Sequence, residues 1–177
     1  PRSSLKKTQT YNLVGNAQAK HRNLLFCKML NPDPRVLTLD GPDQQTATVT
    51  MKEHPKSRVT VVERDGVTHA HQLNYAKKGV TYVFGDIRTH LSGVEEPHDG
   101  INLDTCSGPD GLRPLVAEAL MKLAPRGVLM VTVTKRGSPG AFDKLHAMLG
   151  DCLGERRADW YSIVPMHPLN IDGSRKI

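Results

Sequence analysis

The feature that most constrains the fold is a pair of short apolar runs, each followed by a carboxylate. Residues 36–39 form the first run, which ends at the turn Asp40-Gly41. A polar stretch of helix length, 44–53, leads to a second run, 58–63, whose last residue is Glu63. Such runs are typical of buried parallel strands that stop at the carboxyl edge of a sheet. With about twenty residues between turn and acid, the pattern indicates a nucleoside-binding βαβ unit, in which the acid accepts hydrogen bonds from ribose hydroxyls. The alternative is that Glu63 caps its strand in solvent.

The rest of the chain continues this alternation. Further strands are expected at 80–84, 100–103, 128–134 and 160–164, and helices at 17–30, 66–78, 115–123 and 142–149, with a short or irregular segment at 88–97. Val67, Ala70 and Leu73 share one face of the helix that begins at Gly66. We therefore expect an α/β protein with a three-layer, Rossmann-like, mostly parallel sheet and helices on both faces.

The net charge of +6 is concentrated at one end of the sequence. Residues 1–35 carry seven Lys and Arg against Asp33 alone, whereas residues 36–177 carry seventeen bases and seventeen acids. We expect residues 1–35 to form a basic N-terminal arm and helix, and residues 36–177 to form the Rossmann-like domain. Such an arm attracts nucleic acid through counterion release. The candidate contacts are Lys6, Lys7, Lys20 and Arg22; the alternative is a solvated basic tail.

Composition and missing motifs exclude several classes. The 177 residues, 38% hydrophobic, suit one globular domain, with no apolar run of the ~18 residues that a membrane span needs and no signal-peptide core. Three scattered cysteines favour an intracellular, reducing compartment, cytoplasmic or nuclear. His69 and His71 point ~200° apart on a helix, which disfavours a shared metal ion, and no metal is expected. Neither a Gly-x-Ser-x-Gly elbow nor a P-loop occurs.

The order of elements and four strand ends resemble the class I S-adenosylmethionine-dependent methyltransferases. The similarity covers about residues 32–165. It rests on Asp40-Gly41, Glu63, Gly85-Asp86, the segment from Asp99 to Asp104, and Leu123-Ala-Pro-Arg-Gly127 before a long apolar strand. The resemblance implies S-adenosylmethionine as cofactor. Asp40 and Gly41 would line its methionine part, Glu63 would hold the ribose, Asp86 and Ile87 would flank the adenine, and Asp104 would face the methyl acceptor as the catalytic residue.

Two departures from the family pattern keep a second function open. The family's first loop is glycine-rich, whereas Gly41 here is followed by Pro42 and then by acidic and amide side chains. The segment 102–108 faintly resembles the loop of RNA cytosine-C5 enzymes. A cysteine at a strand end is, however, more often packed near the core than used as a nucleophile, and we expect this for Cys106.

The expected function is a methyltransferase acting on nucleic acid, with RNA favoured over DNA. The alternative is a non-catalytic protein of this fold in a larger protein or ribonucleoprotein assembly; a nicotinamide dehydrogenase ranks third.

Overall fold

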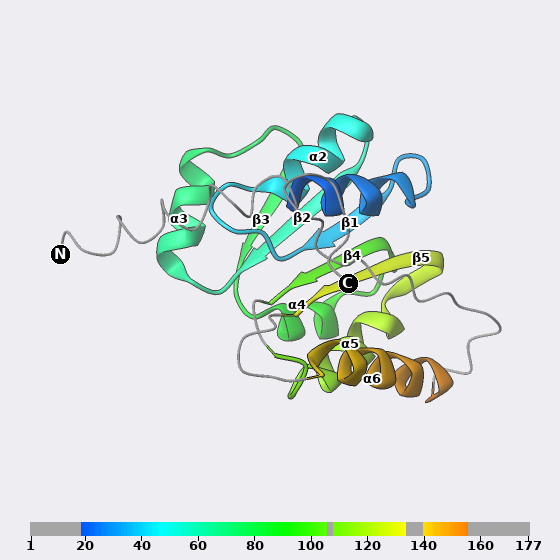
Figure 1. The fold of residues 1–177 in the computed structure, drawn as a ribbon. Coiled ribbons are helices and arrows are strands. Elements are labelled where there is room, and N and C mark those ends of the chain that lie inside the picture. Colours follow the sequence, from blue (N-terminus) through cyan, green and yellow to red (C-terminus); the bar gives the residue numbers. More distant parts are fainter. Residues whose placement is uncertain (1–18, 106–107, 134–139, 156–177) are drawn as a thin grey trace, which may run out of the picture.

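The protein is built on a five-stranded parallel sheet, in the order β3-β2-β1-β4-β5 (Figure 1). The computed structural model describes residues 19–105, 108–133 and 140–155. The strands are β1 (Arg35–Thr38), β2 (Arg58–Glu63), β3 (Val80–Phe84), β4 (His98–Asp104) and β5 (Leu123–Thr132). The helices are α2 (Gln45–Glu53), α3 (Gly66–Asn74), α4 (Ile87–Gly93), α5 (Arg113–Met121) and α6 (Ala141–Glu155), preceded by a helix over residues 19–28. The predicted Rossmann-like α/β fold is confirmed; the strand expected at 160–164 lies outside the described residues.

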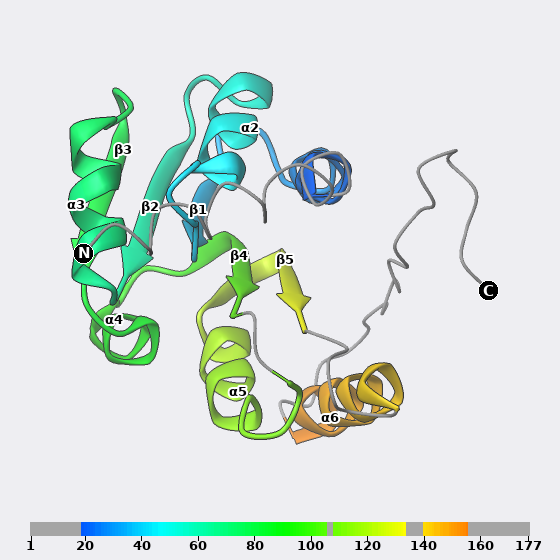
Figure 2. The same cartoon turned by 60° about the vertical axis from the view of Figure 1, so that its left-hand side comes forward.

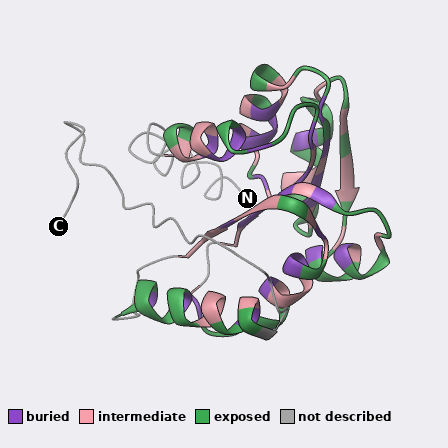
Figure 3. Cartoon of the chain, turned by 90° about the vertical axis from the view of Figure 1, so that its right-hand side faces the viewer, coloured by how far each residue is buried: buried purple, intermediate pink, exposed green. Residues whose placement is uncertain are grey.

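Helices cover both faces of the sheet, as Figure 2 shows. Because side chains alternate along each strand, Val61 packs with helix 19–28 and α2, whereas Val62 packs with α4, α5 and α6. Buried residues line the sheet and the inner sides of the helices (Figure 3).

In the described part of the chain, no helix is long and apolar enough to cross a membrane.

The helix over residues 19–28 is packed into the core. Phe26 and Cys27 are 1% and 0% exposed, and they pack with Leu30, Val36 and other residues of this face of the sheet. A Cβ at Gly100 would lie 2.6 Å from Leu30 and 2.8 Å from Phe26, so the helix rests directly on β4. The second half of the basic segment is thus fixed against the sheet by apolar contacts.

The apolar face expected on α3 does not turn toward the core. Val67 and Leu73 are 81% and 51% exposed, and Ala70 is exposed as well. The residue that α3 buries completely is Gln72, whose side chain bonds to the loop after β1. Polar contacts with that loop, rather than the apolar stripe, orient this helix.

The turn expected at 125–127 is a bulge inside β5. His98 pairs with Leu123 and Gly100 pairs with Val128. Between these two pairs β5 advances by five residues while β4 advances by two, which is a bulge on β5. A Cβ at Gly127 would lie 2.9 Å from the carbonyl oxygen of Ala124, which explains the glycine at this close approach.

Candidate cofactor site at the carboxyl edge of the sheet

The parallel strands bring the predicted site residues to one edge. Asp40, Glu63, Asp86 and Asp104 follow or end β1, β2, β3 and β4, respectively. The strand order reverses between β1 and β4, and ligands of open α/β sheets bind outside the carboxyl ends at this switch point. The edge near Asp40 and Asp104 is therefore where the topology favours a ligand.

The Asp40 carboxylate caps the helix that follows it. Its two oxygens accept hydrogen bonds from the backbone N–H groups of Thr46 (3.1 Å) and Ala47 (2.8 Å) at the start of α2. These donors would otherwise lack partners, and the helix dipole favours an anion there. Asp40 is 7% exposed, and burial, with a smaller contribution from the charge of Asp104, raises its pKa to about 6 against the lowering effect of these bonds.

A buried polar network ties β1, β4 and α2 together beneath Asp40. The Asn102 side chain donates to the hydroxyls of Thr38 (3.2 Å) and Thr46 (2.9 Å), and all three residues are at most 2% exposed. Buried polar groups need such partners to avoid a desolvation cost of about 1–3 kcal/mol each. The network holds the ends of the two strands at the switch point.

Side chains also hold the loop that replaces the glycine-rich turn. Gln72 Nε2 donates to the carbonyl oxygens of Asp40 (2.6 Å) and Gly41 (3.3 Å). Gln44 is buried with φ 49°, and it bonds to Gln72, Tyr75 and Tyr82 rather than pointing across the strand ends. Gly41 is exposed, and a Cβ there would meet nothing within 4 Å. The loop therefore leaves space on its outer side.

Glu63 lies half-buried at the end of β2. Its Oε1 accepts the backbone N–H of Asp65 at 2.7 Å, and among the described residues its Oε2 has no hydrogen-bond partner. Asp65 in turn caps α3 by accepting from the Thr68 N–H, which lowers the pKa of Asp65. One carboxylate oxygen of Glu63 thus remains open to a ligand hydroxyl.

Asp86 and Ile87 stand at the start of α4. The exposed Asp86 carboxylate accepts from the backbone N–H groups of Arg88 (2.9 Å) and Thr89 (3.3 Å). The Ile87 side chain is 8% exposed and packs in the core beside Leu91. A ligand at this position would contact the Asp86 side chain and the main chain of Ile87.

Asp104 is joined to the basic N-terminal segment by an ion pair. Arg22 Nη2 lies 3.0 Å from Asp104 Oδ2, and the two side chains are 27% and 31% exposed. Helix 19–28 therefore begins at the carboxyl edge, while Asn31, just beyond its end, bonds to Asp99 at the start of β4. Lys20 is exposed near the same edge; Lys6, Lys7 and Cys106 lie outside the described residues.

Sequence reasoning missed the residues that shape the site from below. Thr38 and Asn102 interrupt otherwise apolar strands, and that interruption is the signal that could have found them. Gln44 and Gln72 carry no comparable signal, because their contacts join segments 28 residues apart. In the described part of the chain, no three His, Cys, Asp or Glu side chains are grouped to hold a metal ion.

Two open positions at this edge fit S-adenosylmethionine. Glu63 offers a carboxylate oxygen to ribose hydroxyls, and the outer side of Gly41 is unobstructed. The Asp40 carboxylate is already used by α2, so it would contribute charge rather than a direct bond.

Comparisons with solved structures agree with the sheet topology. The chain is similar to a SAM-dependent methyltransferase from Agrobacterium tumefaciens (15% identity, TM-score 0.60, 76% of this chain and 49% of that one). It is also similar to a putative rRNA-methylase from Clostridium thermocellum (11%, 0.59, 76% and 78%) and to spermidine synthase from Thermotoga maritima (15%, 0.60, 77% and 50%). The chain thus spans about half the length of two of these proteins. No protein-family profile and no curated protein matches it.

The sheet order and these likenesses define the fold. The chain has the Rossmann-like fold of the S-adenosylmethionine-dependent methyltransferases. At these identities the likeness establishes the fold alone, because one fold hosts many reactions.

Proposed function

We propose that this protein is an S-adenosylmethionine-dependent methyltransferase that acts on nucleic acid, RNA in preference to DNA. The observation that carries the proposal is the grouping of Asp40, Glu63 and Asp104 at the switch-point edge of a methyltransferase-type sheet. When bound, the cofactor supplies a methyl group already activated on a sulfonium. The protein must then hold the acceptor in line and, where needed, remove a proton.

Asp104 is the proposed residue facing the acceptor. Its carboxylate stands at the end of β4, and the Arg22 guanidinium contacts Oδ2 from the side of helix 19–28. A charge-assisted bond of this kind fixes the orientation of the carboxylate. Asp104 would orient an amine or hydroxyl, or accept its proton, while Arg22 acts as a positioning residue.

The path of the chain supports an RNA acceptor. The ion pair between Arg22 and Asp104 places the first turn of helix 19–28 at the edge that carries Asp104. The sequence before residue 19 contains Arg2, Lys6 and Lys7, and it joins the described part of the chain at this helix. The likeness to a putative rRNA-methylase is in keeping with such an acceptor.

Neutralising the first three basic residues is expected to weaken the salt dependence of RNA binding. Replacing Arg2, Lys6 and Lys7 by glutamine should flatten the slope of log affinity against log salt by about 2, at ~0.7 for each phosphate contact on a single strand. The measurement is the affinity for a single-stranded RNA across a salt series. A variant with Lys52, Lys56 and Lys78 replaced, all exposed on the domain, is the matched control. Equal slopes for wild type and the arm variant would contradict an RNA-binding arm.

A second candidate is a non-catalytic protein of the same fold within an assembly. It is favoured by the loop from Asp40 to Gln44, which is pinned by side-chain hydrogen bonds where the family has glycines. Transfer of a labelled methyl group from S-adenosylmethionine to RNA separates the two candidates. Labelled RNA supports the enzyme; cofactor binding without any transfer to nucleic acid supports the assembly component.

A further inference from the structure

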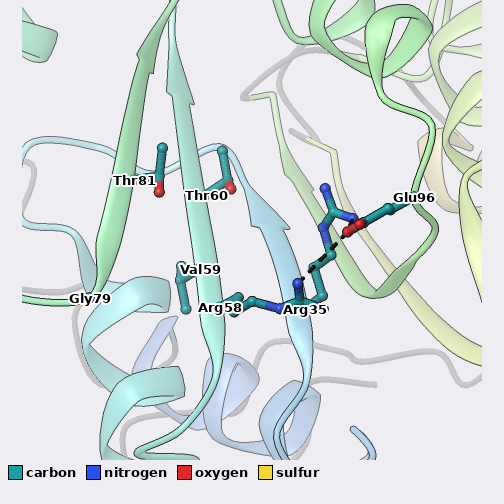
Figure 4. Close-up of a pocket in the computed structure, with 7 residues that line it drawn as sticks. All are labelled: Arg35, Arg58, Val59, Thr60, Gly79, Thr81 and Glu96. Atoms are coloured by element: carbon teal, nitrogen blue, oxygen red, sulfur yellow. Dashed lines mark hydrogen bonds and ion pairs between the residues drawn. The ribbon is translucent and has the colours of Figure 1, made fainter.

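A pocket opens on the opposite side of the molecule from the proposed cofactor site. It has a volume of about 220 Å³, and its lining includes Arg35, Arg58, Thr60, Gly79, Thr81 and Glu96 (Figure 4). The lining comes from the beginnings of β1, β2 and β3 and from the segment between α4 and β4. Since the six residues of β2 span about 20 Å, the pocket is well separated from the carboxyl edge.

The pocket is open because α4 is short. This helix has seven residues, about 10 Å of length, and packs Ile87 and Leu91 in one cluster with Val62. Thr60, two residues before Val62, lies on the same face of β2 and pairs in register with Thr81. Two hydroxyl-bearing side chains thus lie on a part of the sheet face that α4 leaves uncovered.

The charges of the pocket do not balance. Glu96 Oε2 lies 3.7 Å from Arg58 Nη1 and also contacts Arg35 Nη1, so one carboxylate serves two guanidinium groups. The nearby Asp99 is bonded to the Asn31 side chain and to the backbone N–H of Arg35. The Arg58 side chain is 73% exposed, and within the described residues Glu96 is its only ion-pair partner. The residues that line the pocket therefore carry two guanidinium groups against one carboxylate, while the charged Asp99 carboxylate stands outside the lining.

We propose that this pocket binds one phosphate group. Two guanidinium groups and two hydroxyls line the pocket, all of them groups from which phosphate oxygens accept hydrogen bonds, and arginine binds phosphate through paired N–H groups. A volume of about 220 Å³ falls below the ~300–1,000 Å³ of sites that enclose whole small molecules. The site thus suits a single phosphate, free or in the backbone of a nucleic acid. The proposal does not depend on methyltransferase activity.

The test is a titration with inorganic phosphate at constant ionic strength, followed by the NMR shifts of the backbone amides. Saturable shifts are expected at Thr60, Gly79 and Thr81. Arg58→Gln should weaken binding at least five-fold, whereas Glu96→Gln should tighten it several-fold because the competing carboxylate is gone. Arg88→Gln, an exposed arginine at the other edge, is the control and should leave the affinity unchanged.

The opposite signs expected for the two variants make the test decisive. Shifts that do not saturate, an unchanged affinity in Arg58→Gln, or no tightening in Glu96→Gln would overturn the proposal. Repeating the titration with a short single-stranded RNA distinguishes the source. If the RNA shifts the same amides and Arg58→Gln weakens that response, the ligand is a phosphate of a nucleic-acid backbone. If only inorganic phosphate shifts these amides, the ligand is free phosphate.

Discussion

Raising the pH from about 4 to about 7 should cost the wild-type protein about 2–3 kcal/mol of stability relative to an Asp40→Asn variant. Burial raises the pKa of Asp40 from 3.8 to about 6, so the folded protein holds this proton more tightly than the unfolded chain. The stabilisation is therefore fully present below about pH 3.8 and is lost as the pH rises through about 6. Asparagine keeps the shape and an acceptor oxygen but does not titrate.

Denaturant unfolding of both proteins at several pH values gives the difference directly. Asp43→Asn, an exposed carboxylate in the same loop, is the matched control and should follow the wild type. A constant difference between wild type and Asp40→Asn across this range would mean that Asp40 is not a buried, titrating carboxylate. Its cap on α2 would then have to be reconsidered.

Replacing Glu63 by alanine is expected to lower the affinity for S-adenosylmethionine by about 10- to 100-fold. In the proposed site, Glu63 accepts hydrogen bonds from ribose hydroxyls, each worth ~1.5–3 kcal/mol when the acceptor is charged. The fold should survive, because among the described residues the side chain makes one hydrogen bond, to the N–H of Asp65. Calorimetric titration measures the affinity.

The control for this variant is Glu95→Ala. Glu95 is an exposed acid before β4, at the other edge of the sheet, so its loss changes net charge equally without touching the proposed site. Wild-type affinity in a folded Glu63→Ala variant would remove Glu63 from the ribose role. Equal losses of cofactor affinity in Glu63→Ala and Glu95→Ala would mean that Glu63 acts through long-range electrostatics and not through direct hydrogen bonds.

Local patterns predicted the sheet well. The bounds expected for β2 and β3 are those observed, because each strand is a short apolar run between turn residues. The β-branched and polar helix α2 also forms, since Asp40 supplies its missing N-terminal partner. The bulge at 125–127 escaped prediction because it depends on pairing with β4.

The parts of the site that no pattern indicated are those made by distant residues. Arg22 and Asp104 lie 82 positions apart, and each was given a separate role, nucleic-acid contact and catalysis, before the fold joined them. The exposure of Val67 and Leu73 likewise depends on which face α3 turns to the loop after β1. Periodicity shows that a helix has faces; tertiary contacts decide which face is buried.

Calorimetric titration of the wild-type protein with S-adenosylmethionine tests whether the carboxyl edge of this sheet binds that cofactor. We expect saturable binding with one site per chain. At a concentration 100-fold above Kd, the cofactor should add about 2.7 kcal/mol to the free energy of unfolding. No heat of binding together with an unchanged unfolding midpoint would contradict the claim.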